Sequence, residues 1–429
     1  MKQLLVRIVT WIHFRIFHRD ISPAMREFLS HTAWSLVGIF FNAAVFFVLS
    51  IVAGRLLGPS GYGKYSLVIA ITAAITALMT AGFDVTAVKY ISQFTDPEEK
   101  NAALSNSLLF VFPFSLGVFL VLALFRQPLA AALHTDAQLI VLGLLFSLVF
   151  TYKTLLDGFV KALKQFPLQA GVKIVEALVA LGFFIAFFFL LGHESYQFYL
   201  YAIGLGGISS ILIYLVSVRG RIRRWNPAVF LKEKAYLKTF IAFSVVGIIL
   251  NSIDKFFVAH FLGTAALGLY SVYLLSATVI VAQGILVINN VFFPMVNQVD
   301  DKHQLMRTLD RFLVAAFVPV ILLAGAVSYA VVMLFGHAYG IHWWLILMVS
   351  LIAFAQIASS LYNSVLGSST RLFGLSTRIY YLKPLFVMML YSGVYFAGAT
   401  SIGSVLGILL LSYLFDVANT KVTLRLIPA

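Results

Sequence analysis

The sequence contains no cysteine and few charged residues, and both absences exclude classes of protein. Without cysteine the chain can form neither disulfides nor thiolate metal sites, and it has no cysteine nucleophile. Charged residues make up only 11% of its 429 positions, whereas soluble domains carry roughly 25%. Because 61% of the residues are hydrophobic, the chain cannot cover itself with polar groups, and lipid is expected to be its main solvent.

Motifs for catalysis and metal binding are also missing. The nine histidines are scattered, without an H-E-x-x-H pattern or a close cluster with carboxylates. No Walker, Rossmann or G-x-S-x-G fingerprint occurs. The sequence therefore predicts a protein that is not an enzyme and that uses no metal or cofactor. Its net charge of +14 is assigned to membrane topology rather than to nucleic-acid binding.

Long apolar runs recur along the chain, and a helix needs roughly 20 apolar residues to cross a bilayer. The runs lack the alternation of membrane β-strands. The predicted spans are 34–54, 65–88, 104–125, 138–158, 172–191, 197–217, 240–261, 267–292, 311–335, 343–363, 379–397 and 401–419. The expected fold is an all-α integral membrane protein with about 12 transmembrane helices.

Lysine and arginine fix the predicted orientation. With the N-terminus in the cytoplasm, only Arg55, Lys64, Arg126 and Lys255 lie toward the outer side, as the positive-inside rule requires. Both termini are therefore predicted to be cytoplasmic, in a multi-pass protein of the cytoplasmic (inner) cell membrane. The segment 1–33 is interpreted either as a basic amphipathic helix on the inner leaflet or as a partly ordered basic tail.

Two segments about 205 residues apart resemble each other, which indicates an internal duplication. S-L-V-G-I-F-F-N (Ser35–Asn42) matches S-V-V-G-I-I-L-N (Ser244–Asn251). R-L-L-G-P-S-G-Y-G-K-Y (Arg55–Tyr65) matches H-F-L-G-T-A-A-L-G-L-Y (His260–Tyr270). With six spans in each half, both copies enter the membrane from the same side. Parallel repeats of this kind face each other across a central path in transporters.

The duplication predicts two six-helix bundles around a central cavity. The expected segments are 34–218 for the N-terminal bundle, 219–238 for a basic cytoplasmic linker, 239–420 for the C-terminal bundle and 421–429 for a cytoplasmic tail. Three prolines, Pro113, Pro294 and Pro319, are expected to kink their helices. These kinks are interpreted as hinges or as static packing features.

Charged residues inside a membrane are costly, so they are expected to line a wet cavity or to pair with each other. The candidates for the transport cavity are Asn42, Arg55, Arg126, Lys153, Asn251, Asp254 and Lys255. Each has a plainer interpretation. Lys153 is expected to form an i,i+4 pair with Asp157. Arg55 and Arg126 could reach the headgroups from the ends of their helices.

The segments Arg55–Ser66, Asn251–Gly263 and Val291–Val296 resemble the patterns of polysaccharide transporters and O-antigen flippases. This family belongs to the multidrug/oligosaccharidyl-lipid/polysaccharide exporter superfamily. The resemblance implies a flippase that moves a polyprenyl-pyrophosphate-linked oligosaccharide (an O-antigen, capsule or exopolysaccharide repeat unit) by alternating access. It also implies contact with membrane lipids, with H+ or Na+ as a candidate coupling ion and a polysaccharide polymerase as a candidate partner.

Three alternatives remain at this point. An ion-coupled multidrug and toxin extruder is the nearest, although Val45 stands where an acid would align with Asp254 in the first helix. The lipid II flippases of the superfamily have more spans than this chain has room for. A membrane-embedded glycosyltransferase or ligase would need a large outer loop, and the predicted outer loops are short.

Overall fold

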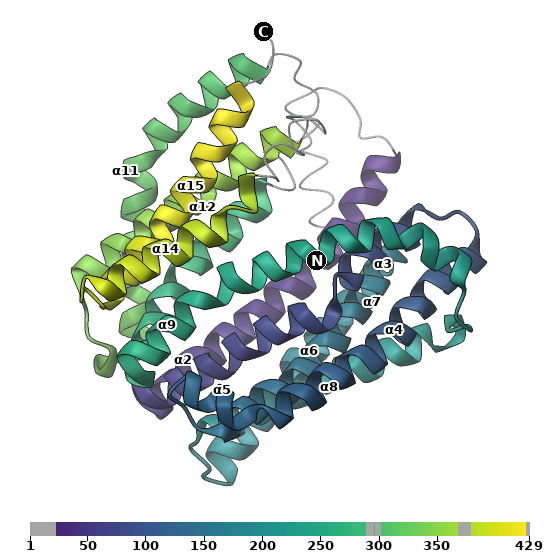
Figure 1. Ribbon diagram of the computed structural model, residues 1–429, viewed down its shortest axis with the longest axis horizontal. Coiled ribbons are helices and arrows are strands. Elements are labelled where there is room, and N and C mark those ends of the chain that lie inside the picture. Colours follow the sequence, from purple (N-terminus) through teal and green to yellow (C-terminus); the bar gives the residue numbers. More distant parts are fainter. Residues whose placement is uncertain (1–22, 289–295, 297–301, 368–378, 426–429) are drawn as a thin grey trace. The chain divides into compact units, whose positions relative to one another are not determined.

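The computed structural model describes residues 23–288, 296, 302–367 and 379–425, and these residues form helices without a strand (Figure 1). The predicted segment 1–33 lies mostly outside them. The helices of the first half are α2 (Pro23–Thr80), α3 (Phe83–Gln93), α4 (Pro97–Leu124), α5 (Arg126–Ala132), α6 (Ala137–Ala162), α7 (Phe166–Ile185), η1 (Ala186–Leu190), α8 (Tyr196–Val218) and η2 (Arg219–Arg221). Those of the second half are α9 (Pro227–Val287), α11 (Lys302–Phe335), η4 (His337–Tyr339), α12 (Trp343–Gly367), α14 (Lys383–Phe396) and α15 (Ile402–Arg425).

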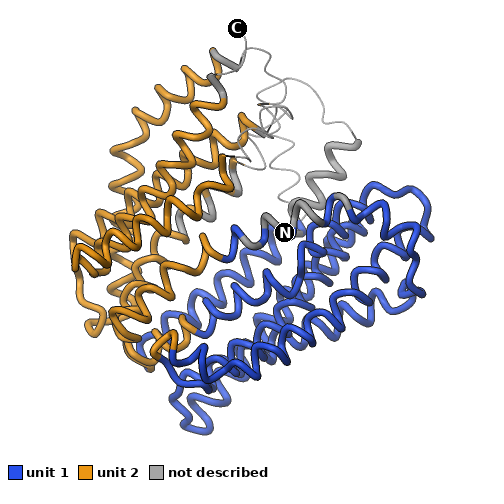
Figure 2. Tube along the Cα trace, in the orientation of Figure 1, with its two compact units in different colours: residues 1–56, 68–131, 135–248 blue, residues 57–67, 132–134, 249–429 orange. Residues whose placement is uncertain are grey.

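Two compact units make up the chain (Figure 2). Unit 1 comprises residues 1–56, 68–131 and 135–248. Unit 2 comprises residues 57–67, 132–134 and 249–429. Unit 2 thus includes two short segments of the first repeat together with most of the second repeat. The predicted domain boundaries, which follow the repeats, stay a prediction.

Nine of the described helices are long and apolar enough to cross a membrane. Two of them, Leu36–Thr80 and Val246–Thr278, contain a glycine with non-helical dihedrals and so correspond to two predicted spans each. The predicted span 379–397 is found as the shorter helix α14, of 14 residues. The predicted all-α membrane fold is confirmed.

The two non-helical glycines lie at equivalent positions of the repeats. Gly58 has φ 64° and ψ 178°, and Gly263 has φ 84° and ψ 174°. A residue with a Cβ rarely adopts these dihedrals, so glycine is needed for the chain to turn within one residue. Pro59 then opens the next helix, where its fixed φ and missing N–H are tolerated. The break between the predicted spans 34–54 and 65–88 is therefore only one residue long.

A second break divides the helix that was predicted at 65–88. The helix ends at Thr80, and Ala81 and Gly82 have φ 46° and 77° before α3 begins at Phe83. After α3, Asp96 caps α4 by accepting a hydrogen bond from the Glu98 amide at 3.0 Å. Such a cap satisfies one of the free N–H groups at a helix start. Hydropathy does not register these breaks, because the apolar run continues across them.

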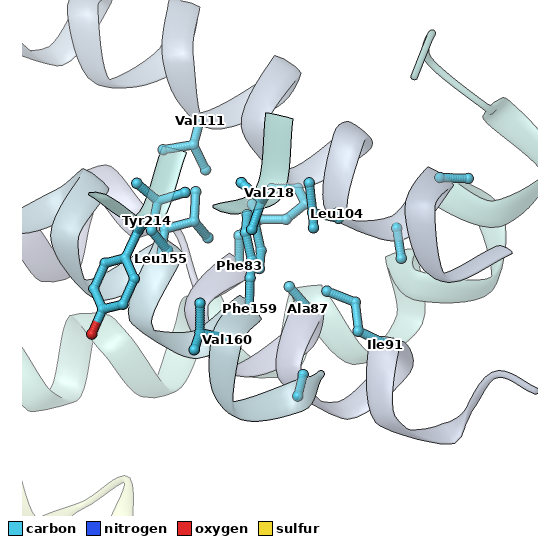
Figure 3. Close-up of a cluster of buried hydrophobic side chains, with 14 of the residues drawn as sticks. Phe83, Ala87, Ile91, Leu104, Val111, Leu155, Phe159, Val160, Tyr214 and Val218 are labelled. Carbon is cyan, nitrogen blue, oxygen red and sulfur yellow. The ribbon is translucent and has the colours of Figure 1, made fainter. Parts of the chain in front are cut away.

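The core of unit 1 includes a cluster of buried side chains from α3, α4, α6, α8 and the start of α9 (Figure 3). Phe83, Leu155 and Phe159 are fully buried in it. Elsewhere in the unit the helices approach closely at small residues. A Cβ on Gly38 would lie 2.5 Å from the Ala170 Cα atom. Such close packing is how membrane helices associate when lipid supplies no hydrophobic driving force between them.

Candidate functional site

Among the ion pairs of the described helices, two groups that include sequence candidates are here called the first and second networks, one in each unit. The first network consists of Lys153, Asp157, Lys161, Lys173 and Glu176, on α6 and α7 of unit 1. The second network consists of two separate ion pairs of unit 2, Asp254 with Lys255 on α9 and Lys383 with Asp416 on α14 and α15. Both networks lie mainly within apolar helices, where an isolated charge would be costly.

Lys153 and Glu176 form the most buried ion pair of the first network. The ammonium contacts the carboxylate Oε1 atom, and the Ser210 hydroxyl donates to Oε2 at 3.1 Å. The Glu176 residue is only 3% exposed. The expected pair of Lys153 with Asp157 is therefore wrong. The i,i+4 spacing allows that pair, but α7 places a better-buried carboxylate beside the lysine.

Asp157 serves instead as the shared acceptor of the first network. Its carboxylate lies 2.7 Å from Lys161 Nζ and 3.9 Å from Lys173 Nζ. Gln169 and Tyr214 donate to its Oδ1 atom at 2.9 and 2.8 Å. Three lysines thus face two carboxylates, so the first network carries a net charge of about +1 with ordinary protonation states. Lys173 is the lysine with the weakest ionic contact.

Asn42 supports this arrangement from α2. Its side-chain amide donates to the Lys173 backbone carbonyl at 2.9 Å, across 131 residues of sequence. The other two candidates of the first repeat lie near helix ends. Arg55 is exposed and lies three residues before the Gly58 break, and Arg126 is exposed and opens α5.

The second network has a buried carboxylate on α9. Asp254 is 3% exposed and accepts a hydrogen bond from the Tyr270 hydroxyl at 2.5 Å. Lys255 Nζ lies 3.6 Å from the Asp254 Oδ2 atom and donates to the Asn251 carbonyl at 3.2 Å. The adjacent residues Asp254 and Lys255 are therefore brought into contact although they project in different directions along the helix. The Asn251 residue itself is exposed.

A second ion pair joins α14 to α15. Lys383 Nζ lies 2.7 Å from the Asp416 Oδ2 atom, and the lysine side chain is 5% exposed. Its ammonium also lies 5.6 and 5.5 Å from the ring centroids of Tyr380 and Tyr413. With two lysines and two aspartates, the second network is balanced in charge.

Three lysines of these networks, Lys161, Lys173 and Lys383, were not among the sequence candidates. Lys173 and Lys383 were assigned to cytoplasmic segments by the positive-inside rule, since both lie near predicted helix starts. Spacing would have misassigned Lys173, because Glu176 follows it at i+3 but pairs with Lys153, while Lys173 lies near Asp157 on α6. For Lys383 the partner Asp416 is 33 residues away, and only the packing of α14 against α15 brings them together.

Unit 2 also contains a close contact between equivalent segments of the repeats, here called the glycine contact. A Cβ on Gly63 would lie 1.7 Å from the Thr264 carbonyl oxygen, and one on Gly268 would lie 1.9 Å from the Pro59 oxygen. The Ser60 and Thr264 hydroxyls lie 3.4 Å apart in the same place. Neither glycine can therefore carry a side chain without moving the facing backbone.

The predicted kinks are only partly within the described residues. Pro113 lies inside α4 and Pro319 inside α11, whereas Pro294 lies outside the residues that the structure describes. Their role as hinges stays a prediction. The described part of the chain contains no group of three histidines or carboxylates that could hold a metal ion.

Comparison with known proteins points to one family and one fold. The family model described as polysaccharide biosynthesis protein matches residues 28–299. An inward-facing multidrug resistance MATE family transporter of the MOP superfamily is similar in structure, with a TM-score of 0.59 at 14% identity over 91% of this chain and 96% of that one. A MOP superfamily transporter from Pyrococcus furiosus, whose binding pocket is described as having reverse polarity, gives 0.56 at 12% identity over 93% and 94%.

MATE in the bent conformation gives a TM-score of 0.53 at 14% identity over 93% of this chain and 94% of that chain. At such low identities the similarity shows the fold alone. No curated protein matches the sequence.

Proposed function

Because the chain belongs to the polysaccharide biosynthesis protein family and has the fold of a MOP superfamily transporter, we propose that it is a flippase for a polyprenyl-pyrophosphate-linked oligosaccharide. The substrate would be an O-antigen, capsule or exopolysaccharide repeat unit. The family resemblance predicted from the sequence is confirmed, and with it a membrane transporter rather than an enzyme. The substrate is the part that we propose.

The observation that carries this proposal is the charge of the first network. Three lysines and two carboxylates leave one formal positive charge on α6 and α7, with Lys161 half exposed in the last turn of α6. A pyrophosphate is anionic, and moving it through a medium of low dielectric needs a compensating cation. Lys173 is the natural partner because its contact with Asp157, at 3.9 Å, is the longest of the network's ion pairs. The sugar hydroxyls would be met by neutral polar groups such as the side chain of Asn42.

The second network suits energy coupling better than binding of an anion. Its two lysines match its two aspartates in number. Asp254 is nearly inaccessible, and its principal donor is the neutral Tyr270 hydroxyl. We place the coupling ion, H+ or Na+, at Asp254 in this scheme. A polysaccharide polymerase acting on the translocated product remains the proposed partner.

The proposed orientation places both termini in the cytoplasm and the protein in the cytoplasmic membrane. It is supported by the cluster Arg219–Arg224 and the nearby Lys232 and Lys234, whose side chains are mostly exposed at one end of unit 1. Positively charged segments of this kind are retained on the cytoplasmic side.

An ion-coupled extruder of multidrug type is the second candidate, and the similar MATE structures favour it at the level of fold. The charge of the first network argues against it for cationic drugs. An excess of lysine would repel such substrates in a low-dielectric interior.

Transport by reconstituted protein separates the two candidates. Proteoliposomes would carry a fluorescent prenyl-pyrophosphate-linked oligosaccharide, and flipping would be measured as protection from a membrane-impermeant quencher. We expect Lys173→Gln to slow flipping at least tenfold and Lys173→Arg to retain most of it. Lys173 is chosen because Asp157 keeps Lys161, Gln169 and Tyr214 as donors, so the fold should tolerate the change.

The control is Lys164→Gln, which removes an exposed lysine just after α6. Wild-type flipping by Lys173→Gln would overturn the role of this lysine. Efflux of cationic dyes by the wild-type protein, without flipping of the lipid-linked sugar, would favour the extruder.

A further inference from the structure

The short segment between α8 and α9, residues 219–225, carries four arginines and is here called the arginine segment. Its sequence is R-G-R-I-R-R-W, and Arg219, Arg223 and Arg224 are exposed while Arg221 is half-buried. No aspartate or glutamate occurs between Glu194 and Glu233. The local charge is therefore wholly positive.

The backbone of the arginine segment is held in place by buried polar side chains of α4. Ser105 Oγ accepts a hydrogen bond from the Arg223 amide at 2.7 Å. Asn106 forms a reciprocal pair with Asn226, accepting from its amide at 2.8 Å and donating to its carbonyl at 2.9 Å. Both α4 side chains are fully buried. The positive-inside rule depends only on how many basic residues lie on one side of the membrane. It does not explain why hydrogen bonds hold the backbone of these arginines in one position.

The guanidinium groups of the arginine segment have no ion pair with the part of the chain that the structure describes. Two acids that lie close to this region in the fold or the sequence, Glu99 and Glu233, are already paired or buried. Glu99 pairs with Lys232 at 2.6 Å, and Glu233 is fully buried. Arg223 donates from one nitrogen to the carbonyls of Gly220 and Ile222. The cluster thus presents uncompensated arginine charge from a fixed backbone.

Two exposed apolar side chains flank this charge, as is typical of segments at a membrane surface. Ile222 is 38% exposed and Trp225 is 40% exposed, on either side of Arg223 and Arg224. Tryptophan is enriched at the level of lipid headgroups. Arginine binds phosphate oxygens in a bidentate manner, and it does so more specifically than lysine. The expected ligand is a lipid whose headgroup carries phosphate.

We propose that the arginine segment is a docking site for the pyrophosphate headgroup of the prenyl lipid in the cytoplasmic leaflet, where the substrate binds before translocation. This inference rests on the proposed function. The pyrophosphate is favoured over a phospholipid phosphodiester because it offers more charge and more oxygens to several guanidinium groups at once. The site would raise the local concentration of substrate beside the transporter, as charged surfaces do for ligands of opposite sign.

The test measures binding of farnesyl pyrophosphate to the purified full-length protein in neutral detergent. The variant Arg219→Gln/Arg221→Gln/Arg224→Gln retains Arg223, whose side chain contacts the backbone. The matched control, Lys100→Gln/Lys164→Gln/Lys234→Gln, removes the same number of positive charges from lysines that lie near helix ends. We expect the arginine variant to bind at least tenfold more weakly and the control to bind like the wild type.

Specificity is measured by competition. Farnesyl monophosphate and phosphatidylglycerol micelles should displace the probe at least tenfold less well than unlabelled farnesyl pyrophosphate. Replacing the same three arginines by lysine keeps the charge and should give intermediate binding. Retained helicity and a single gel-filtration peak show that each variant is folded.

Three results would overturn the inference. They are equal weakening in the arginine variant and the lysine control, equal competition by phosphatidylglycerol, and wild-type binding by the arginine variant. Flipping assays on the same variants distinguish a failure of the docking-site inference from a failure of the proposed function. If the arginine variant binds and flips like the wild type while Lys173→Gln does not flip, the docking site is wrong and the flippase stands. If the wild type never flips the lipid-linked sugar, the function itself is wrong.

Discussion

Glu233 predicts a pH-dependent packing of residues 227–238, which form the start of α9 within unit 1 and are here called the linker. It lies on α9 between Val229 and Leu237, which both belong to the buried cluster of Figure 3. Its residue is 0% exposed, and neither carboxylate oxygen has a hydrogen-bond partner among the residues that the structure describes. Burial raises the pKa of Glu233 from 4.5 to about 8, because the charged form is poorly solvated there.

The sign of the effect follows from linkage. When the linker detaches, Glu233 is solvated and titrates near its ordinary pKa of 4.5. The attached state therefore binds more protons between the two pKa values, and its stability falls as the pH rises from 4.5 through 8. The difference in pKa corresponds to a total loss on the order of 5 kcal/mol. Between about pH 6 and pH 8.5, roughly 2–3 kcal/mol of this is lost.

Hydrogen exchange of the peptide 227–238 measures the attachment directly. Wild type and Glu233→Gln are compared at each pH, so intrinsic exchange rates cancel. We expect the wild-type peptide to exchange faster than the peptide of the variant. The ratio of the two exchange rates should grow roughly 50-fold between pH 6 and pH 8.5, because exchange occurs from the detached state and the loss of stability raises its population by that factor. The control is Glu98→Gln, which removes an exposed carboxylate from the first turn of α4. A ratio that does not change with pH would refute the reasoning.

Three further predictions concern the ion pair of the first network and the glycine contact. Lys153→Gln leaves Glu176 buried without its cation and should lower stability by roughly 3–5 kcal/mol, while Lys153→Gln/Glu176→Gln should recover most of the loss in a thermal denaturation assay. Gly63→Ala should destabilise by about 1–3 kcal/mol, because its Cβ meets backbone. The double variant Ser60→Cys/Thr264→Cys should form a disulfide, since the two hydroxyls are 3.4 Å apart. If transport opens the glycine contact, this disulfide should stop flipping until it is reduced.

The controls for these variants come from the chain itself. A Cβ on Gly117, inside α4, meets nothing within 4 Å, so Gly117→Ala should leave the melting temperature unchanged or raise it. The absence of native cysteine makes each single-cysteine variant a clean control for the cross-link. Undiminished flipping by the oxidised double variant would show that the glycine contact stays closed during transport.

The membrane spans and the break at Gly58 could be predicted from local sequence, whereas the break at Ala81 and Gly82 could not. Apolar length alone predicts a spanning helix, and a Gly-Pro step predicts where the chain turns. The match of Gly58 with Gly263 could be read directly from the repeat, and the structure gives both the same unusual dihedrals. These features depend on residues close together in the chain, so a single sequence contains the information.

The partners of the charged residues could not be predicted in the same way. Lys153 has a carboxylate one turn away on its own helix, and the i,i+4 rule selects it. The structure pairs it with Glu176, 23 residues away on α7. Which helices become neighbours is decided by packing at small residues, such as Gly38 against Ala170, and this leaves no signal in the spacing of the charges.

The sixth helices of the two repeats show how a duplicated fold came to hold different charges. Ser210 and Asp416 both lie 14 residues after the first residue of their helices, α8 and α15. Ser210 donates to Glu176, whereas Asp416 is itself the acid that pairs with Lys383. Both positions are therefore polar and make a contact, but the carboxylate lies on α7 in the first network and on α15 in the second. The net charge of each network depends on such differences between the repeats. The fold alone therefore cannot specify the substrate. The proposed preference for an anion rests on residues in which the two repeats differ.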